Sequence, residues 1–130
     1  MPITDIQFDN GVFFAREVDY ITEDDAHNWA RALGHYAAAS PRPIVALVDA
    51  REVTAISNDA RRVFAMASEI SNVRVAVVIV NPGNRLATQQ SRITALLSTV
   101  RKTHDTYFFE SVTDAEEFIG QIVSVPARTS

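Results

Sequence analysis

The chain contains no cysteine among its 130 residues. Disulfide bonds, thiol nucleophiles and thiolate metal sites are therefore excluded, and folding must rely on a hydrophobic core. The longest apolar run covers residues 75–80, far short of the ~20 residues that span a bilayer. The start, MPITDIQFDN, has neither the basic beginning nor the apolar stretch of a signal peptide. We therefore expect a cytoplasmic protein without a membrane span.

Clustered positive charge is also scarce. The 12 Lys and Arg residues are outnumbered by 16 Asp and Glu residues, which gives a formal net charge of −4. Nucleic-acid-binding proteins usually carry an electropositive face, so we expect no nucleic-acid partner. Hydrophobic residues make up 47% and charged residues 22%, as in an ordinary globular chain rather than a disordered one. We expect a single domain over residues 1–125 and a frayed tail over residues 126–130.

Apolar periodicity predicts a regular alternation of strands and helices. Apolar residues spaced three and four apart predict four helices, with faces within residues 26–37, 60–70, 86–100 and 115–122. Short apolar or alternating runs predict five strands, at residues 5–9, 12–19, 44–48, 73–80 and 106–109. The order is β-β-α-β-α-β-α-β-α. It predicts an α/β fold with a single five-stranded mixed, mostly parallel sheet that begins with an antiparallel hairpin.

Several local signals mark where these elements begin and end. Residues 9–11, Asp-Asn-Gly, favour the tight turn of a hairpin. Thr22, followed by Asp25, resembles a capping box. The prolines within residues 40–43 predict the end of the first helix, and Asp114 is a candidate cap for the last helix.

Three aromatic residues bear on packing and assembly. Trp29 lies on the apolar side of its helix, so we expect it to pack against the sheet rather than to line a ligand site. Phe13 and Phe14 are neighbours in a strand and therefore point to opposite faces. A hairpin face left uncovered would favour a homodimer.

The stretch LVDAREVTAISNDARRVFA, residues 47–65, predicts a buried strand ending near Asp49, an irregular loop and a helix start. Ser57 suits the N-cap position, where its hydroxyl accepts a hydrogen bond worth about 1 kcal/mol. The alternative is that Ser57 accepts a phosphate, because a helix N-terminus stabilises anions. We favour the cap.

Charged residues surround this junction and allow two interpretations. The arginines can bind an anion near the helix start, or they can form a solvated face that pairs with Asp49, Glu52 and Asp59. Arg85 follows the next strand, and the carboxyl edge of an α/β sheet is where ligands bind. The candidates for interaction or anion binding are Asp49, Arg51, Ser57, Asn58, Arg61, Arg62 and Arg85.

The order of the elements and the spacing of Asp49, Val53 and Ile56 resemble the STAS domain, the fold of bacterial anti-sigma factor antagonists and of the cytoplasmic tails of sulfate transporters. The ending TYFFESVTDAEEFI is similar to the last strand and helix of that family. The closest likeness is to stand-alone STAS-like or Sec14-like bacterial proteins. The resemblance implies regulation through a kinase-like or sigma-regulatory protein partner.

The phosphorylation motif of the family is altered in this chain. Phosphorylated members open the helix with Asp-Ser-Ser-Gly or Asp-Ser-Thr-Gly, and the first hydroxyl residue after the Asp takes the phosphate. Aligned on Asp49 and Ile56, Asn58 stands at that acceptor position and Ala60 at the glycine. A shift of one residue brings Ser57 onto the acceptor position but moves Ile56 off its core position.

We therefore expect a non-enzymatic regulatory protein-interaction module of the STAS-like type, which binds its partner through the junction loop and helix after Asp49. The alternative is a small-molecule or lipid carrier of the Sec14-like type, which needs an apolar cavity. No Gly-x-Ser-x-Gly elbow is present, and His27 and His35 are eight residues apart, too far for two ligands of one metal ion on a helix. We expect neither a metal nor a cofactor.

Overall fold

The first two strands form a hairpin whose turn depends on Asn10 and Gly11. In the computed structural model, which describes residues 3–81 and 104–124, β1 (Ile3–Asp9) pairs antiparallel with β2 (Val12–Ile21). Asn10 has φ 51° and Gly11 has φ 79°, a left-handed conformation that these two residue types tolerate well. The predicted hairpin is confirmed.

The first helix, α1 (Glu23–Ala39), begins and ends where the sequence predicts. The hydroxyl of Thr22 accepts a hydrogen bond from the backbone N–H of Asp25, and the Asp25 carboxylate accepts one from the backbone N–H of Thr22. This reciprocal arrangement is a capping box, as predicted. The helix ends at Ser40, just before the first proline of the following loop.

The five strands form one sheet in the order β1-β2-β3-β4-β5. All neighbouring pairs after the hairpin are parallel, which confirms the predicted mixed, mostly parallel sheet. The remaining described elements are β3 (Ile44–Ile56), α2 (Asn58–Ala67), β4 (Val73–Ile79), β5 (Asp105–Phe109) and α4 (Val112–Ser124). The helix expected over residues 86–100, Arg85 and the tail 126–130 lie outside the described residues.

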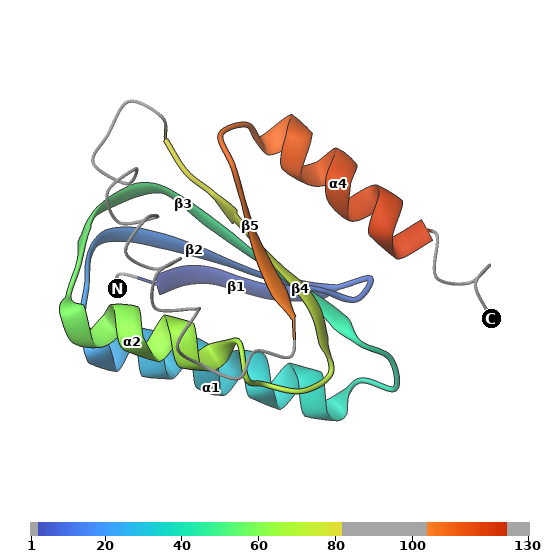
Figure 1. Cartoon of the computed structure of the whole chain (residues 1–130), viewed down its shortest axis with the longest axis horizontal. Helices are drawn as coiled ribbons and strands as arrows, with labels where there is room; N and C mark the ends of the chain where they lie inside the picture. The colour runs from blue at the N-terminus through green and yellow to red at the C-terminus, as the bar shows by residue number, and fades with distance from the viewer. Residues whose placement is uncertain (1–2, 82–103, 125–130) are drawn as a thin grey trace.

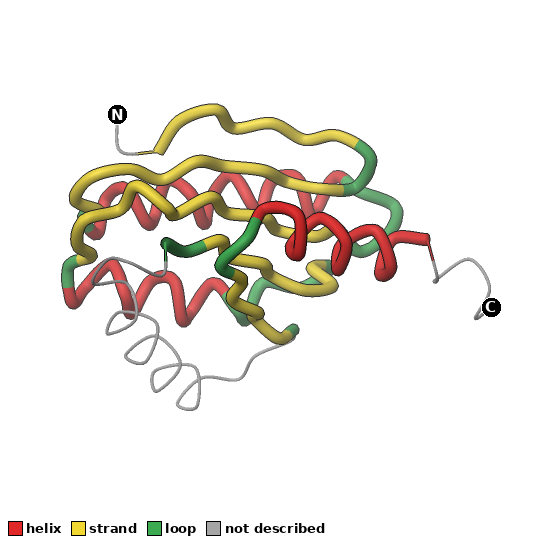
Figure 2. Tube along the Cα trace, turned by 90° about the horizontal axis from the view of Figure 1, so that it is seen from above, coloured by secondary structure: helices red, strands yellow, loops and turns green. Residues whose placement is uncertain are grey.

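Helices cover both faces of the sheet. Helices α1 and α2 lie side by side on one face, and α4 lies on the other (Figures 1 and 2). The larger hydrophobic core fills the space under α1 and α2 and includes Phe13, Leu33 and Ile44. The smaller one includes Val77 and Ile119 and lies under α4. Strand residues alternate between these two cores, as the pleat requires.

Trp29 is buried within the larger core, as predicted. Its ring lies 6.3 Å from the ring of Phe13 and 5.4 Å, edge-on, from that of Phe64 in α2. Phe13 also meets the ring of Tyr36 at 5.4 Å. These contacts join α1 both to the sheet and to α2.

Strand β3 is longer than predicted. The expectation of a strand ending near Asp49 and an irregular loop before Asn58 is wrong, because β3 continues through Ile56. The partner strand β2 is long enough to pair with it as far as Ile21 and Ile56, so the backbone groups of this segment find hydrogen-bond partners in the sheet. Val53 and Ile56 are buried, which adds the apolar contacts of a strand.

The cap of the last helix also differs from the prediction. Helix α4 begins at Val112, and the hydroxyl of Ser111 accepts a hydrogen bond of 3.3 Å from the backbone N–H of Asp114. Ser111 therefore takes the capping role that we expected of Asp114. Serine is as good a cap as aspartate, and it stands three residues earlier.

The turn between α2 and β4 is fixed by Asn72. Its backbone has φ 63°, and its side-chain amide donates to the carbonyl oxygens of Ala37 at 2.7 Å and Ser40 at 3.1 Å. The turn is thereby joined to the end of α1, more than 30 residues earlier in the chain. Asparagine meets both demands, because it tolerates the left-handed region and carries two amide hydrogens.

We predict that Asn72→Ala lowers the free energy of unfolding by about 2–4 kcal/mol, because it removes partly buried hydrogen bonds to the end of α1 and strains a left-handed backbone. Asn72→Gly loses the same hydrogen bonds without the strain, so it should be less destabilising than Asn72→Ala by about 1 kcal/mol. Urea denaturation of the three proteins measures both differences. Equal stabilities of the alanine and glycine variants would show that the left-handed backbone of residue 72 does not contribute to the free energy of unfolding.

Candidate functional site

Strand β3 contains two extra residues relative to β2. Arg16 and Val18 of β2 stand opposite Asp49 and Glu52, and then Asp19 and Tyr20 stand opposite Val53 and Ala55. One β3 residue is therefore inserted at each of two places. Asp19, beside the second insertion, has φ 58°. Such bulges change the direction in which side chains point, and here they lie within the junction predicted as a site.

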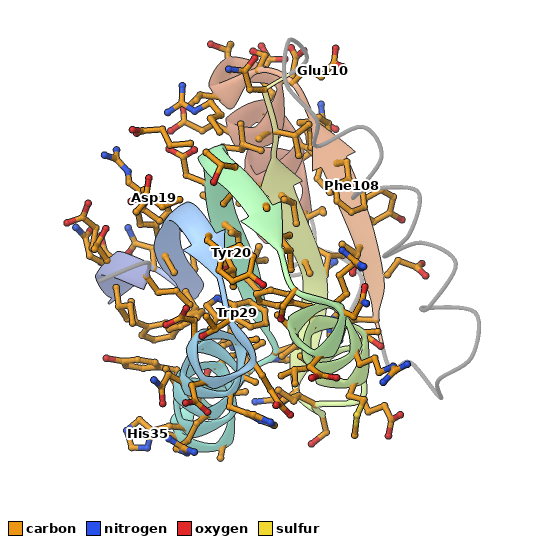
Figure 3. All side chains as sticks on the ribbon, turned by 90° about the vertical axis from the view of Figure 1, so that its left-hand side faces the viewer. Asp19, Tyr20, Trp29, His35, Phe108 and Glu110 are labelled. Carbon is orange, nitrogen blue, oxygen red and sulfur yellow. The ribbon has the colours of Figure 1, made fainter. Side chains whose placement is uncertain are left out.

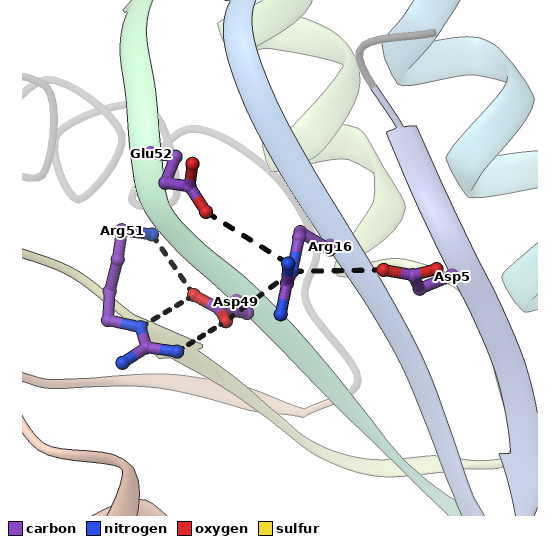
Figure 4. A network of polar contacts seen from close by, with 5 residues as sticks. All are labelled: Asp5, Arg16, Asp49, Arg51 and Glu52. Carbon is purple, nitrogen blue, oxygen red and sulfur yellow. Dashed lines mark hydrogen bonds and ion pairs between the residues drawn. The ribbon is translucent and has the colours of Figure 1, made fainter.

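The first insertion lies beside a close ion pair between Asp49 and Arg51. The guanidinium Nε donates to Asp49 Oδ1 at 2.9 Å and Nη2 donates to Oδ2 at 2.8 Å, while the backbone N–H of Arg51 also donates to Oδ1 at 3.2 Å (Figure 4). The Asp49 side chain is only 8% exposed. Hydrogen bonds from Arg51 lower the pKa of Asp49 below its ordinary value. The predicted pairing of Arg51 with a neighbouring carboxylate is confirmed.

Arg16 connects this pair to two further carboxylates. Its Nε lies 3.9 Å from Asp5 and 3.9 Å from Asp49, and Nη1 lies 4.0 Å from Glu52 (Figure 4). The network spans β1, β2 and β3, and three carboxylates outnumber two guanidinium groups. Its net negative charge opposes the binding of an anion at Arg51. Sequence reasoning missed Arg16, although a parallel register places it directly opposite Asp49.

Ser57 is the N-cap of α2, as predicted. Its hydroxyl accepts a hydrogen bond of 3.0 Å from the backbone N–H of Ala60, and its own backbone N–H donates to Ile21 at the end of β2. The side chain thus satisfies one of the N–H groups that the first helical turn leaves unpaired. The same cap anchors the start of α2 to the sheet.

Arg61 and Arg62 have different environments. Arg61 is only 5% exposed, its Nη1 donates to the carbonyl of Ile56 at 2.8 Å, and its Nη2 donates to Asn58 Oδ1. The interpretation of both arginines as one solvated face is therefore wrong for Arg61. It ties the first turn of α2 to the end of β3. Arg62 is exposed and forms the predicted ion pair with Asp59, at 3.6 Å.

The outward side of α2 combines predicted residues with Met66, which was not predicted. Asp59, Arg62 and Met66 recur three and four residues apart, which places them on one side of the helix. Met66 is 60% exposed, so its apolar side chain is accessible to a partner. Sequence reasoning missed Met66, although the spacing from Asp59 and Arg62 was a usable signal. We call Asn58, Asp59, Arg62 and Met66 the α2 surface.

Tyr20 lies at the same end of the sheet as the start of α2. It pairs with Ala55 of β3, two residues before the Ser57 cap, and it is 51% exposed. Figure 3 looks at this end and shows Tyr20 beside Asp19 near the ends of β2 and β3. The structure therefore brings an exposed aromatic ring to the junction that the sequence singled out, next to a helix with an exposed methionine.

His27 Nε2 lies 3.5 Å from the carboxylate of Glu23, one turn earlier on α1. Within residues 3–81 and 104–124, no three His, Cys, Asp or Glu residues are grouped so as to hold a metal ion. None of the helices in these ranges has the length and apolar character needed to cross a bilayer.

The two adjacent arginines form a matched pair for mutagenesis. We predict that Arg61→Ala lowers the free energy of unfolding by about 2–4 kcal/mol, because it leaves the buried carbonyl of Ile56 without this donor. Arg62→Ala, which removes an exposed ion pair, should change stability by no more than about 0.5 kcal/mol. Guanidinium denaturation of both variants tests the contrast. Similar losses in the two variants would contradict the different roles assigned to these arginines.

Comparisons with known proteins bear on the fold. No family model and no curated protein matches the chain. Among solved structures, an uncharacterised protein of the DUF3478 family with a SpoIIAA-like fold, from Shewanella loihica PV-4, matches with TM-score 0.60 and 20% identity over 89% of this chain and 92% of that one.

A second solved structure, an anti-sigma factor antagonist from Mycobacterium paratuberculosis, matches with TM-score 0.60 and 18% identity over 91% of this chain and 94% of that one. Both likenesses extend over about nine tenths of each chain. The chain has the SpoIIAA-like fold, which anti-sigma factor antagonists share.

Proposed function

We propose that this chain is a non-enzymatic regulatory module that binds a protein partner through the α2 surface and the adjacent Tyr20. The observation that carries the proposal is the exposure of Met66, at 60%, on the outward side of a helix that is otherwise firmly anchored. Ser57 and Arg61 hold the first turn of α2 to the ends of β2 and β3. A rigid helix with an exposed apolar residue is a good basis for a protein interface.

The charges of the α2 surface support recognition of a specific partner. Arg62 and Asp59 lie at the solvent side of the helix, and their ion pair, at 3.6 Å, is loose enough to be exchanged for contacts with a partner. A methionine adapts to irregular surfaces because its side chain is unbranched and polarisable. The fold shared with an anti-sigma factor antagonist supports a kinase-like or sigma-regulatory protein as the partner.

The proposal does not depend on a phosphorylation switch. The hydroxyl of Ser57 is engaged as a cap, and Asn58, at the acceptor position of the family motif, has no hydroxyl. A phosphate on Ser57 would lie at the positive end of the α2 dipole, which tolerates it. The carrier alternative stays a prediction, which native mass spectrometry tests.

The partner surface can be tested by introducing glutamate on α2. A photo-crosslinking amino acid at position 66, introduced in the host cell, should capture the partner, and calorimetry with the purified partner then gives Kd. We predict that Arg62→Glu and Met66→Glu each raise Kd at least about tenfold, as truncation of interface anchors does. Arg31→Glu, an equal charge change at an exposed site on α1, should leave Kd unchanged. An unchanged Kd in both α2 variants would refute the proposed surface.

Mass spectrometry of the protein purified from its own host separates the remaining alternatives. Under denaturing conditions we predict an unmodified mass, because Ser57 acts as a cap and the acceptor position lacks a hydroxyl. Under native conditions we predict the same mass. A phosphate-sized increase mapped to Ser57 would restore the switch, and a ligand present only under native conditions would favour the carrier.

A further inference from the structure

Glu17 is a carboxylic acid inside the larger hydrophobic core. It lies on β2, where Phe13, Ala15 and Glu17 alternate along the face that α1 covers. Its exposed fraction is only 3%. Its antiparallel partner on β1 is Ile3, which also packs against this core. A fully buried Glu without a partner is rare in proteins.

Nothing in the described structure compensates for this burial. Glu17 Oε2 is buried without a hydrogen bond, and so is the indole Nε1 of Trp29 on the facing side of α1. Figure 3 shows Trp29 between α1 and the sheet. Burial of an ionised carboxylate without hydrogen bonds costs far more than burial of the neutral acid, so the site strongly favours the protonated form.

Among the charged groups on the elements around Glu17, Asp25 adds to the effect of burial. From α1, Asp25 of the capping box repels a negative charge at Glu17. From α2, the buried guanidinium of Arg61 donates to Ile56 and Asn58. From β1, the neighbour is the apolar Ile3.

The charged groups of β2 and β3 closest in register lie on the other face of the sheet. Arg16 precedes Glu17 and therefore points to the opposite face. Asp49, Glu52 and Arg51 belong to the network around Arg16 (Figure 4). That network cannot serve as the counter-charge of Glu17 within the core.

We propose that Glu17 makes the docking of α1 on the sheet depend on pH: α1 packs tightly over the neutral acid, and ionisation of Glu17 loosens that packing. Two observations make α1 the responsive element. Its first turn contributes the repelling Asp25, and its buried Trp29 has an indole N–H without a hydrogen bond. Both residues belong to α1, so a charge on Glu17 acts on the packing of this helix.

The direction of the effect follows from proton binding. Burial, together with Asp25, raises the pKa of Glu17 from 4.5 to about 8. Between these values the folded chain keeps a proton that the unfolded chain has released. Stability is therefore greatest at the acidic end of this window and falls as the pH rises from 4.5 through about 8. The buried His104 acts in the opposite direction, because burial lowers its pKa below 6.5.

The test compares the full-length protein with Glu17→Gln, which keeps the shape of the side chain but cannot ionise. Between pH 5 and pH 9, the unfolding equilibrium constant of the wild type should rise about 10²- to 10³-fold relative to that of Glu17→Gln. Taking the ratio cancels the contribution of His104. Glu69→Gln, at an exposed carboxylate, is the matched control and should follow the wild type.

Trp29 reports on the docking of α1 directly, because it is the single tryptophan of the chain. Without denaturant, its fluorescence should shift to longer wavelength as Glu17 ionises, with a midpoint near pH 8, and the shift should be absent in Glu17→Gln. The proposal is overturned if wild type and Glu17→Gln have parallel pH profiles of stability, or if the fluorescence of the wild type does not change.

If Glu17→Gln fails to fold, direct titration of the Glu17 carboxyl carbon by NMR in the wild type decides the question. A midpoint above pH 7 supports the proposal, and a midpoint below pH 5 overturns it. These measurements require no partner. Their outcome is therefore independent of the binding proposed for the α2 surface.

Discussion

Strands β2 and β3 pair in parallel from Val12 and Val45 to Ile21 and Ile56, and this pairing positions the centre of the polar network and the start of α2. It brings Arg16 opposite Asp49 and Tyr20 opposite Ala55, and it ends where Ser57 donates to the carbonyl of Ile21. The start of α2 is therefore fixed by the sheet rather than by a loop. The two extra residues of β3 are accommodated within the pairing, at the places where the polar side chains gather.

Arg61 and Glu17 are both buried, but they differ in their hydrogen bonds. Arg61 is buried, but it donates to a backbone carbonyl and to Asn58, so its charge is compatible with its position. Glu17 is buried without such contacts, and the protein accommodates it as a neutral acid. Arg61 fixes the start of α2, and an arginine stays charged at all ordinary pH values. Glu17 makes the docking of α1 on the sheet depend on pH.

Much of the fold was accessible from local patterns. Periodicity identified α1 and α2, and Thr22, Ser57 and the Asn10–Gly11 turn act as their residue types predict. The end of β3 was not accessible, because Arg51, Glu52 and Thr54 interrupt its apolar pattern and only pairing with β2 keeps them in a strand. The burial of Arg61 could not be predicted from the sequence either. Its neighbour Arg62 is chemically identical, and a difference of 100° around the helix axis decides which of the two meets the core.

The bulge in β1 has a consequence for the behaviour of the protein at high concentration. Strand β1 is an edge of the sheet, and its pairing with β2 is irregular between Thr4 and Gln7, where Asp5 has φ 55°. An edge strand with free backbone groups and exposed apolar residues such as Ile6 invites the strand of another molecule. The kink and the charge of Asp5 interrupt the straight edge that such an addition needs. Asp5 therefore contributes both to this protection against aggregation and to the Arg16 network, so replacing it would affect both.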